Sequence, residues 1–535
     1  MKSIKKFLAV ILSMTLMLTL GTATFGAQKT LPSGKDTGSI NVTNLKPGDT
    51  VTAYQFVKAN YNEYGFTGYS AINNYVKDPV APTVQEVIDM ASNVATMTVV
   101  AEKKVATGDT EVTLNGLPVG YYLVMVTSGS ETVYSPMIAG IYYSKSATDN
   151  TLTNGAISAD SDFEIKAQKC WAKSSTPKLE KTIVTPSSKN SKGDDIAIGD
   201  KTTFKLSATV PSYSKEYKKV TYKIYDIMSE GLDYVDGSMK CFIEKYENNR
   251  ENIKVTPKVN GGIIEITFDS KFILEHPGQK IQVEYQAKLN EKAGVNFDAN
   301  INKAYLEYSN NPASGSTAKT GEDKVYVYTF GIDSNLFGKS TEKWNEKTKE
   351  LIKVEEGEYQ WVETEKESGI FTTTTALEGA TFTLTNNKTK KSYTATSDKY
   401  GYLKFTGLDA GEYTLQETDA PDGFTLNDAK HTVVITAEYN QDGTLKSYTI
   451  KIDDKATSTY TATYDKGVIK TITSTKDSQG NISESAILKN SKMSFLPSTG
   501  GVGTTIFAIV GVVFVAVALG LHMILRGKSK LEQDR

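Results

Sequence analysis

Cysteine and histidine are scarce in this sequence. Its 535 residues include only two cysteines and three histidines. The cysteines, Cys170 and Cys241, allow at most one disulfide, and we expect two unpaired thiols instead. The histidines are scattered, and no cluster has the spacing of metal ligands. We therefore expect neither a metal nor another cofactor.

Sequence motifs of catalysis are also missing. The chain has no Gly-rich phosphate loop, no HExxH motif and no candidate Ser-His-Asp set. Its formal net charge of -2 gives no reason to expect nucleic acid or anionic lipid as a partner. The sequence therefore argues against an enzyme and favours a structural or binding protein.

Tyrosine and short alternating runs are abundant by contrast. The chain has 30 tyrosines, and apolar and polar residues alternate in runs such as 40–42, 204–206, 263–268, 382–384 and 433–435. Each run is bounded by Gly, Asn, Asp or Pro. Many short strands with frequent turns predict β-sandwiches, so we expect an all-β protein. One helix is expected near residues 84–95.

The C-terminus combines three features in a fixed order. An apolar run over residues 502–525 is long enough to span a bilayer, since about 20 residues suffice. The basic residues that follow, within 526–535, predict a cytoplasmic tail. A pentapeptide precedes the run and consists of Leu496, Pro497, Ser498, Thr499 and Gly500.

The N-terminus has the pattern of a secretory signal peptide. Lys2, Lys5 and Lys6 precede an apolar stretch over residues 7–20, and small residues follow it. We expect a signal peptide over residues 1–27, cleaved after Ala27, with Ala23 as the alternative.

These two ends together resemble LPXTG cell-wall sorting signals of Gram-positive bacteria. The resemblance implies a sortase whose cysteine attacks the Thr499–Gly500 peptide bond and holds Thr499 as a thioester. An amine then takes over the acyl group. The chain is thus expected to be a secreted, wall-anchored substrate of the sortase.

Two polar breaks divide the remaining chain. Residues 174–177 form a proline-ended linker, and residues 310–321 form a second break before a predicted strand over 325–330. We therefore expect three domains, over residues 28–174, 175–323 and 324–495.

An internal repeat relates the first and third of these domains. Residues 114–124 match residues 405–415 without a gap, with Gly, Leu, Gly and Tyr aligned. The pattern predicts a strand, a tight Gly turn and a second strand. Tyr122 should share one face of its strand with Val124, and Tyr413 should share one face of its strand with Leu415.

Residues 377–384 and 415–424 resemble the CnaB-type domain of Gram-positive surface proteins, and the whole chain resembles SpaA-type major (backbone) pilins. The resemblance implies tandem Ig-like and CnaB-type β-sandwiches in an elongated array. It implies the structural subunit of a covalent pilus that supports adhesion, with a pilin-class sortase, identical subunits and peptidoglycan as partners. Minor tip or basal pilins and host surface ligands are compatible with it, but no residue identifies one. The alternative is a monomeric, wall-anchored adhesin with the same domains.

Such pilins contain lysine–asparagine isopeptide bonds, and the middle domain has candidates for one. Burial pushes a lysine toward its neutral, nucleophilic form, and a neighbouring buried acid handles the protons while ammonia leaves. The resemblance assigns Lys181 and Asn302 as the bonded pair and Asp226 as the acid. Alternation along its strand puts Asn302 on the face of Ala304 and Leu306.

The outer two domains differ from each other in this respect. In the third domain, Glu417 occupies the acid position of the family and Asn490 the asparagine position. Lys339 is the nearest candidate lysine, although it requires a shift along the chain. In the first domain, Val126 aligns with Glu417, so we expect no bond there.

A pilus also needs a lysine that receives Thr499. The family has this lysine after an extended strand, shortly before the proline of the second domain. The usual Tyr-Pro-Lys is absent here. Spacing to Pro177 favours Lys173, with Lys169 as the second candidate.

Overall fold

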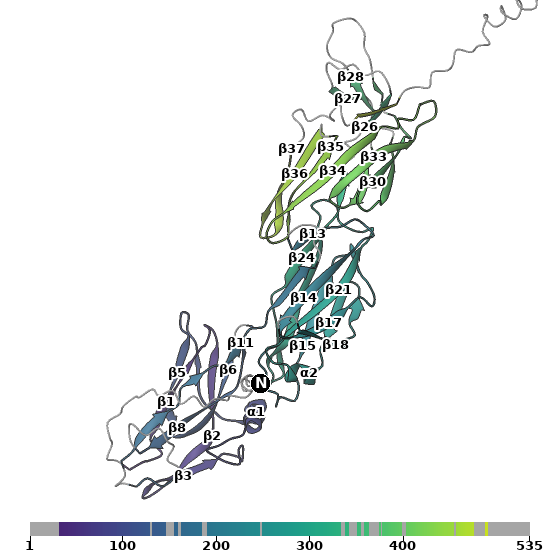
Figure 1. Cartoon of the computed structure of the whole chain (residues 1–535). Helices are drawn as coiled ribbons and strands as arrows, with labels where there is room; N and C mark the ends of the chain where they lie inside the picture. The colour runs from purple at the N-terminus through teal and green to yellow at the C-terminus, as the bar shows by residue number, and fades with distance from the viewer. Residues whose placement is uncertain are drawn as a thin grey trace, which may run out of the picture.

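The structure is a computed structural model of the chain. It describes residues 31–128, 131–145, 155–158, 162–184, 190–246, 249–332, 338–341, 350–354, 358–362, 374–375, 377–398, 403–453, 456–475 and 487–490. Three β-rich bodies follow one another along a bent rod (Figure 1). Within the described residues, no helix has the length and apolar character that a bilayer crossing requires. The predicted signal peptide, the LPSTG motif and the apolar run over 502–525 lie outside the described residues.

The N-terminal body is a sandwich with one covering helix. A six-stranded sheet and a three-stranded sheet share an apolar core, to which both contribute, and α1 packs on a second cluster. Its elements are β1 (Thr37–Thr43), β2 (Thr50–Asn62), β3 (Gly65–Ala71), α1 (Val84–Ser92), η1 (Val94–Thr96), β4 (Val99–Lys104), β5 (Glu111–Pro118), β6 (Gly120–Thr127), β7 (Val133–Tyr134), β8 (Met137–Ser144), β9 (Glu164–Ala167), β10 (Cys170–Trp171) and β11 (Ser174–Ser175). The large sheet runs β3-β2-β6-β8-β9 with β4 on β2, and the small one β10-β1-β5.

The middle body is a sandwich of a six-stranded and a seven-stranded sheet around one large core. Its elements are β12 (Leu179–Ile183), β13 (Gly193–Asp195), β14 (Lys201–Thr209), β15 (Tyr222–Met228), β16 (Leu232–Tyr234), β17 (Lys240–Tyr246), β18 (Asn249–Ile253), β19 (Lys258–Asn260), β20 (Ile263–Thr267), α2 (Ser270–Glu275), β21 (Lys280–Leu289), β22 (Asn300–Asn311), β23 (Ser316–Lys319) and β24 (Asp323–Tyr328). One sheet runs β12-β14-β21-β17-β18 with β16 on β21. The facing sheet runs β13-β24-β22-β15-β20-β19 with β23 on β22.

The C-terminal body is dominated by one seven-stranded antiparallel sheet, in the order β31-β30-β33-β34-β35-β36-β37. Short pairs, β25 with β32 and β26 with β38, accompany it, and β27, β28 and β29 form a separate small sheet. The elements are β25 (Phe330–Ile332), β26 (Gly338–Thr341), β27 (Glu350–Val354), β28 (Glu358–Val362), β29 (Thr374–Thr375), β30 (Thr381–Asn386), β31 (Ser392–Thr396), β32 (Phe405–Leu408), β33 (Gly411–Asp419), β34 (Lys430–Tyr439), β35 (Leu445–Ile452), β36 (Ala456–Asp465), β37 (Val468–Thr475) and β38 (Ile487–Asn490).

The strand expected to open the third domain lies in the middle body instead. β24 pairs antiparallel with β22, with Val325 opposite Asn302, and parallel with β13. The polar break over residues 310–321 is a hairpin, because β23 folds back on the end of β22. Turn-forming residues mark a hairpin within a sheet as readily as a linker. The chain changes bodies only between β24 and β25.

The internal repeat has the structure that its sequence predicts. Gly116 and Gly407 both have a positive φ, of 70° and 77°, which favours glycine at this turn. Tyr122 and Tyr413 are fully buried, and each hydroxyl donates to the backbone carbonyl four residues earlier, that of Pro118 and of Asp409. The predicted helix near residues 84–95 is also confirmed, as α1 and η1.

Both cysteines are free and buried, as expected from the sequence. Cys170 lies in the N-terminal core and Cys241 in the middle core. Burial raises the pKa of each thiol to about 12, so both behave as apolar side chains at neutral pH.

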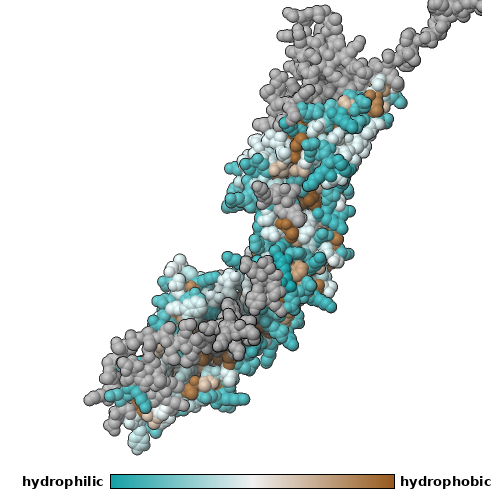
Figure 2. Space-filling view, viewed as in Figure 1, coloured by the Kyte–Doolittle hydropathy of each residue, from teal (hydrophilic) through white to brown (hydrophobic). Residues whose placement is uncertain are grey.

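Polar contacts fix the middle and C-terminal bodies to one another. The Asp195 carboxylate accepts hydrogen bonds from the Ala410 backbone N–H (2.6 Å) and the Tyr439 hydroxyl (2.7 Å). Lys391 Nζ donates to the Ile198 carbonyl at 2.6 Å. At the other junction, the Tyr308 hydroxyl donates to the Glu131 carbonyl. The face seen in Figure 2 is mostly hydrophilic, as expected for a rod in water.

Candidate functional site

The middle core contains a fully buried lysine. Lys181 lies at the centre of β12, and its side chain has no exposed surface. It is the one lysine or arginine among the buried charged residues of the described chain. A buried charge costs free energy unless it is paired or neutralised, so such a residue requires a specific explanation.

Strand register brings Asp226 and Asn302 to the same place. In the antiparallel pair of β15 and β22, Asp226 lies opposite Ala304 and Met228 opposite Asn302. Asp226 and Asn302 are therefore diagonal neighbours on one face of the sheet. Both side chains are fully buried, as are Ala304 and Leu306, which confirms the face predicted for Asn302.

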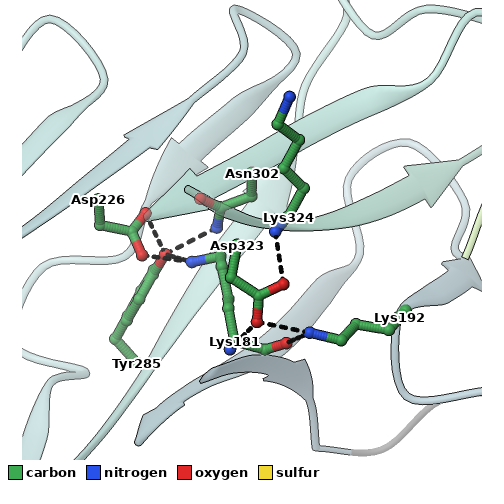
Figure 3. Close-up of polar contacts among 7 residues, drawn as sticks. All are labelled: Lys181, Lys192, Asp226, Tyr285, Asn302, Asp323 and Lys324. Carbon is green, nitrogen blue, oxygen red and sulfur yellow. Dashed lines mark hydrogen bonds and ion pairs between the residues drawn. The ribbon is translucent and has the colours of Figure 1, made fainter. Parts of the chain in front are cut away.

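The three predicted residues converge on a fourth, Tyr285 of β21 (Figure 3). Lys181 Nζ contacts Asp226 Oδ2 directly and lies 3.1 Å from the Tyr285 hydroxyl. The hydroxyl donates to Asp226 Oδ1 at 2.7 Å and accepts from Asn302 Nδ2 at 2.7 Å. Lys181 and Tyr285 belong to one sheet and Asp226 and Asn302 to the other, so the cluster bridges the sandwich.

The surroundings of Lys181 favour its neutral amine. Burial lowers the pKa of Lys181, and the opposing effect of the Asp226 carboxylate only partly offsets it. The rings of Phe204 and Tyr285 flank Nζ, with centroids at 5.0 Å and 5.3 Å. A neutral amine has the free electron pair that nucleophilic attack requires.

The carbonyl oxygen of Asn302 is unsatisfied. Oδ1 is buried and has no hydrogen-bond partner among the described residues. A buried polar atom without a partner is rare and calls for an explanation. Here the amide that would be attacked keeps an oxygen free to accept a hydrogen bond as negative charge develops on it.

The backbone of Lys181 is held by Asp323 of the facing sheet and by Lys192, which directly precedes β13. Its N–H donates to Asp323 Oδ2 at 2.7 Å, and its carbonyl accepts from Lys192 Nζ at 2.6 Å. Lys192 and Asp323 also form an ion pair at 2.6 Å (Figure 3). The outer edge of β12 is thereby satisfied, and the position of Lys181 along the strand is fixed.

Sequence reasoning missed Tyr285, Lys192 and Asp323. Alternation along β21 signals that Tyr285 faces the core with Val283 and Ala287, but nothing in the sequence indicates that its hydroxyl meets Lys181. Asp323 was placed at a domain boundary, which hid its role at β12. The strand of Asn302 is not the last of its sheet in the chain, because β24 follows it and pairs with it.

The third domain is less completely described. Glu417 on β33 is buried and accepts a hydrogen bond from the Asn427 backbone N–H at 2.7 Å. The backbones of β26 and β38 pair in parallel, with Lys339 opposite Leu488 and Thr341 opposite Asn490. Lys339 and Asn490 therefore lie on neighbouring strands, two register positions apart. Their side chains lie outside the described part of the structure.

The first domain has a different core at the matching position. Val126 is buried among apolar side chains where the third domain has Glu417. No lysine is buried among the described residues of this domain. The components of the middle-domain cluster are therefore not assembled there.

The two candidate acceptor lysines flank β10. Lys169 precedes the strand and Lys173 follows it, and both are exposed. The Lys173 carbonyl accepts from the Ser135 N–H at 3.0 Å, which fixes the backbone while the side chain stays accessible. Within the described residues, no hydrogen bond or ion pair holds either amine. The structure therefore does not distinguish between them.

Known protein families match three parts of the chain. The T6 antigen Ig-like domain matches residues 35–174, the SpaA prealbumin-like fold domain residues 360–453, and the LPXTG cell wall anchor motif residues 489–530. The chain is 26% identical to the trypsin-resistant surface T6 protein of Streptococcus pyogenes serotype M6, over 93% of this chain and 96% of that protein.

A solved structure has the same fold. The T6 backbone pilin of serotype M6 Streptococcus pyogenes, with its modular three-domain structure, matches with a TM-score of 0.58 at 21% identity. The match covers 86% of this chain and 100% of that structure. The solved structure shows the shared fold, and the SpaA-type domain, the cell-wall anchor motif and the similarity to the T6 protein support an LPXTG-anchored backbone pilin.

Proposed function

We propose that this pilin forms the shaft of a covalent pilus in which the Thr499 carboxyl of one subunit is joined to a lysine of the next. A pilin-class sortase makes the link, and peptidoglycan receives Thr499 only on the last subunit added. One observation carries the proposal: the sorting motif follows a rod of three bodies, and Lys169 and Lys173 are exposed at the end of the first body.

Lys173 is our first choice of acceptor. The spacing to Pro177 favours it, and the Ser135 N–H holds its backbone carbonyl. An exposed amine on a backbone that is already ordered can approach a sortase-bound thioester at a reduced entropic cost. Lys169 is the second choice because it is equally exposed.

Immunoblots of wall extracts boiled in detergent test this proposal. The wild type should give a ladder of covalent polymers. Lys173→Arg, which keeps the charge but removes the primary amine, should reduce the ladder to a single monomer band. Lys169→Arg is the matched control and should leave the ladder intact. A single band in the wild type would instead indicate a monomeric wall-anchored adhesin, and a ladder that only Lys169→Arg abolishes would make Lys169 the acceptor.

We propose further that Lys181 and Asn302 form an intramolecular isopeptide bond. Lys181 Nζ attacks Cγ of Asn302, a new C–N bond forms, and the amide nitrogen leaves as ammonia. Asp226 holds the proton that the amine must give up before it attacks, and its contact with Nζ supports this role. The bond would tie the two sheets of the middle sandwich together, and a pilus shaft must resist pulling.

The third domain is proposed to form a second bond, between Lys339 and Asn490, with Glu417 as the acid. The parallel pairing of β26 with β38 and the burial of Glu417 support this proposal. Each bond removes one ammonia, so intact mass counts the bonds in the folded chain. We expect none in the first domain.

A further inference from the structure

The Tyr285 hydroxyl contacts both the nitrogen that would enter the proposed bond, Lys181 Nζ, and the nitrogen that would leave, Asn302 Nδ2. We propose that Tyr285 is a catalytic residue, whose phenol transfers a proton from the attacking amine of Lys181 to the leaving amide nitrogen of Asn302. This inference rests on the proposed Lys181–Asn302 bond, and it names the group that completes the reaction.

The geometry around the phenol oxygen is that of a proton shuttle. The oxygen is 3.1 Å from Lys181 Nζ and 2.7 Å from Asn302 Nδ2, and it accepts a hydrogen bond from each. The hydroxyl proton itself points to Asp226 Oδ1, 2.7 Å away. Rotation of this hydroxyl about its C–O bond redirects the proton to Nδ2.

A group of this kind is needed because an amide nitrogen leaves poorly. It must be protonated before the C–N bond breaks, and the amine must lose a proton once it has attacked. Lys181, Tyr285 and Asn302 have no exposed surface, so the proton has to come from within the cluster. Asp226 hydrogen-bonds to Lys181 and Tyr285, but within the described residues to neither atom of the Asn302 amide.

Once Asp226 has taken the proton that makes the amine neutral, the remaining proton transfers balance through Tyr285. The neutral amine attacks Cγ and gives a tetrahedral intermediate with a positive Nζ and a negative Oδ1. Nζ passes one proton to the phenol oxygen while the phenol passes its own to Nδ2. The carbonyl re-forms, the Cγ–Nδ2 bond breaks, and ammonia leaves. Tyr285 ends in its original form.

Tyr285 also keeps the proton that it must donate. Burial raises the pKa of this phenol well above its ordinary range, and the Asp226 carboxylate acts in the same direction. The residue therefore remains a neutral phenol that both donates and accepts at neutral pH.

Removal of this one hydroxyl tests the proposal. Tyr285→Phe keeps the ring that fills the core, and Tyr222→Phe is the matched control, because Tyr222 is buried in the same core and its hydroxyl has no partner among the described residues. The full-length chain is made in a short cell-free pulse and quenched in denaturant at intervals. Digestion and mass spectrometry then measure the fraction of Lys181 cross-linked to Asn302.

The wild type and Tyr222→Phe should complete the bond at the same rate. Tyr285→Phe should react about 100-fold more slowly, which is the usual contribution of a positioned proton-transfer group. Bond formation in Tyr285→Phe at the wild-type rate would overturn the inference. Failure of the wild type itself to form the cross-link would instead overturn the proposed bond.

A second measurement does not depend on how the variant folds. Two protons move together in the shuttle, so the wild-type rate should curve downward as the deuterium fraction of the water rises. A linear dependence would mean that a single proton moves, and it would overturn the role of Tyr285.

Discussion

The N-terminal and middle domains each bury an aspartate in a sandwich core, but they surround it with different groups. Asp49 accepts from the Tyr134 hydroxyl at 2.6 Å and the Ser128 hydroxyl at 3.1 Å, and among the described residues no amine or amide side chain hydrogen-bonds to it. Asp226 meets the amine of Lys181 and a phenol that also contacts Asn302. The comparison teaches that a buried carboxylate satisfied by hydroxyl groups has only a structural role, whereas a lysine and an amide beside it create the possibility of a covalent bond.

Lys181→Met should have the largest effect, because it removes the lysine that distinguishes the middle domain from the N-terminal domain. The cross-link would close a long loop, and a link closing about 100 residues stabilises a domain by roughly 4–5 kcal/mol in the chain-entropy model. We expect a loss of about this size in the free energy of unfolding of the middle domain, measured by denaturant titration. Lys303→Met, which removes an exposed ion pair with Glu322, should cost about 1 kcal/mol or less. Equal stabilities of the two variants would contradict the presence of the bond.

Glu417→Gln extends the comparison to the third domain. The amide cannot handle protons as the carboxyl does, yet it keeps the shape of the side chain and an oxygen for the Asn427 N–H. The variant should be heavier than the wild type by about one ammonia, because the third-domain bond fails while the middle bond forms. A mass change explained by the substitution alone would show that Glu417 promotes no bond.

Tyr134→Phe tests the hydrogen-bonded aspartate of the first domain. Loss of a hydrogen bond to a buried carboxylate should cost about 1.5–3 kcal/mol. Tyr69→Phe is the control in the same domain, because the Tyr69 hydroxyl is buried with no partner among the described residues. Thermal unfolding should separate the two variants, and neither should alter the number of ammonia molecules lost. If either variant lost one ammonia fewer than the wild type, the wild-type first domain would contain a bond where we expect none.

The smallest effect is expected in the pH dependence of stability, measured in a middle domain that cannot form the Lys181–Asn302 bond. Asn302→Ala leaves Lys181 free, and its lowered pKa means that the unfolded chain binds more protons than the folded chain below about pH 10.4. The stability of this variant should therefore rise as the pH approaches about 10.4 from below. The double variant Lys181→Met with Asn302→Ala lacks this amine, so its stability should rise less with pH. Parallel curves would show that Lys181 is not the titrating group.

Alternation and turn residues were enough to predict the strands and the all-β class, because both are local properties of the chain. The repeat around Tyr122 and Tyr413 was equally accessible, since it is carried by aligned glycines and tyrosines. The boundary between the second and third domains could not be predicted in this way, because hairpin turns and linkers use the same types of residue. Only pairing across the sheet shows that β24 belongs with β22.

The candidate site likewise contains residues that could be assigned from the sequence and residues that could not. Lys181, Asp226 and Asn302 were assigned by resemblance, and the structure places them in one cluster. Tyr285 and the Lys192–Asp323 clamp come from strands whose register no local pattern determines. Residues that act through contacts between distant strands stay hidden until the sheets are assembled.

The intact mass of the wild-type chain, with a map of its cross-linked peptides, tests the central claim most directly. We predict one ammonia lost for each bond and a peptide that joins Lys181 to Asn302. An unchanged mass, with Lys181 and Asn302 recovered in separate peptides, would contradict it.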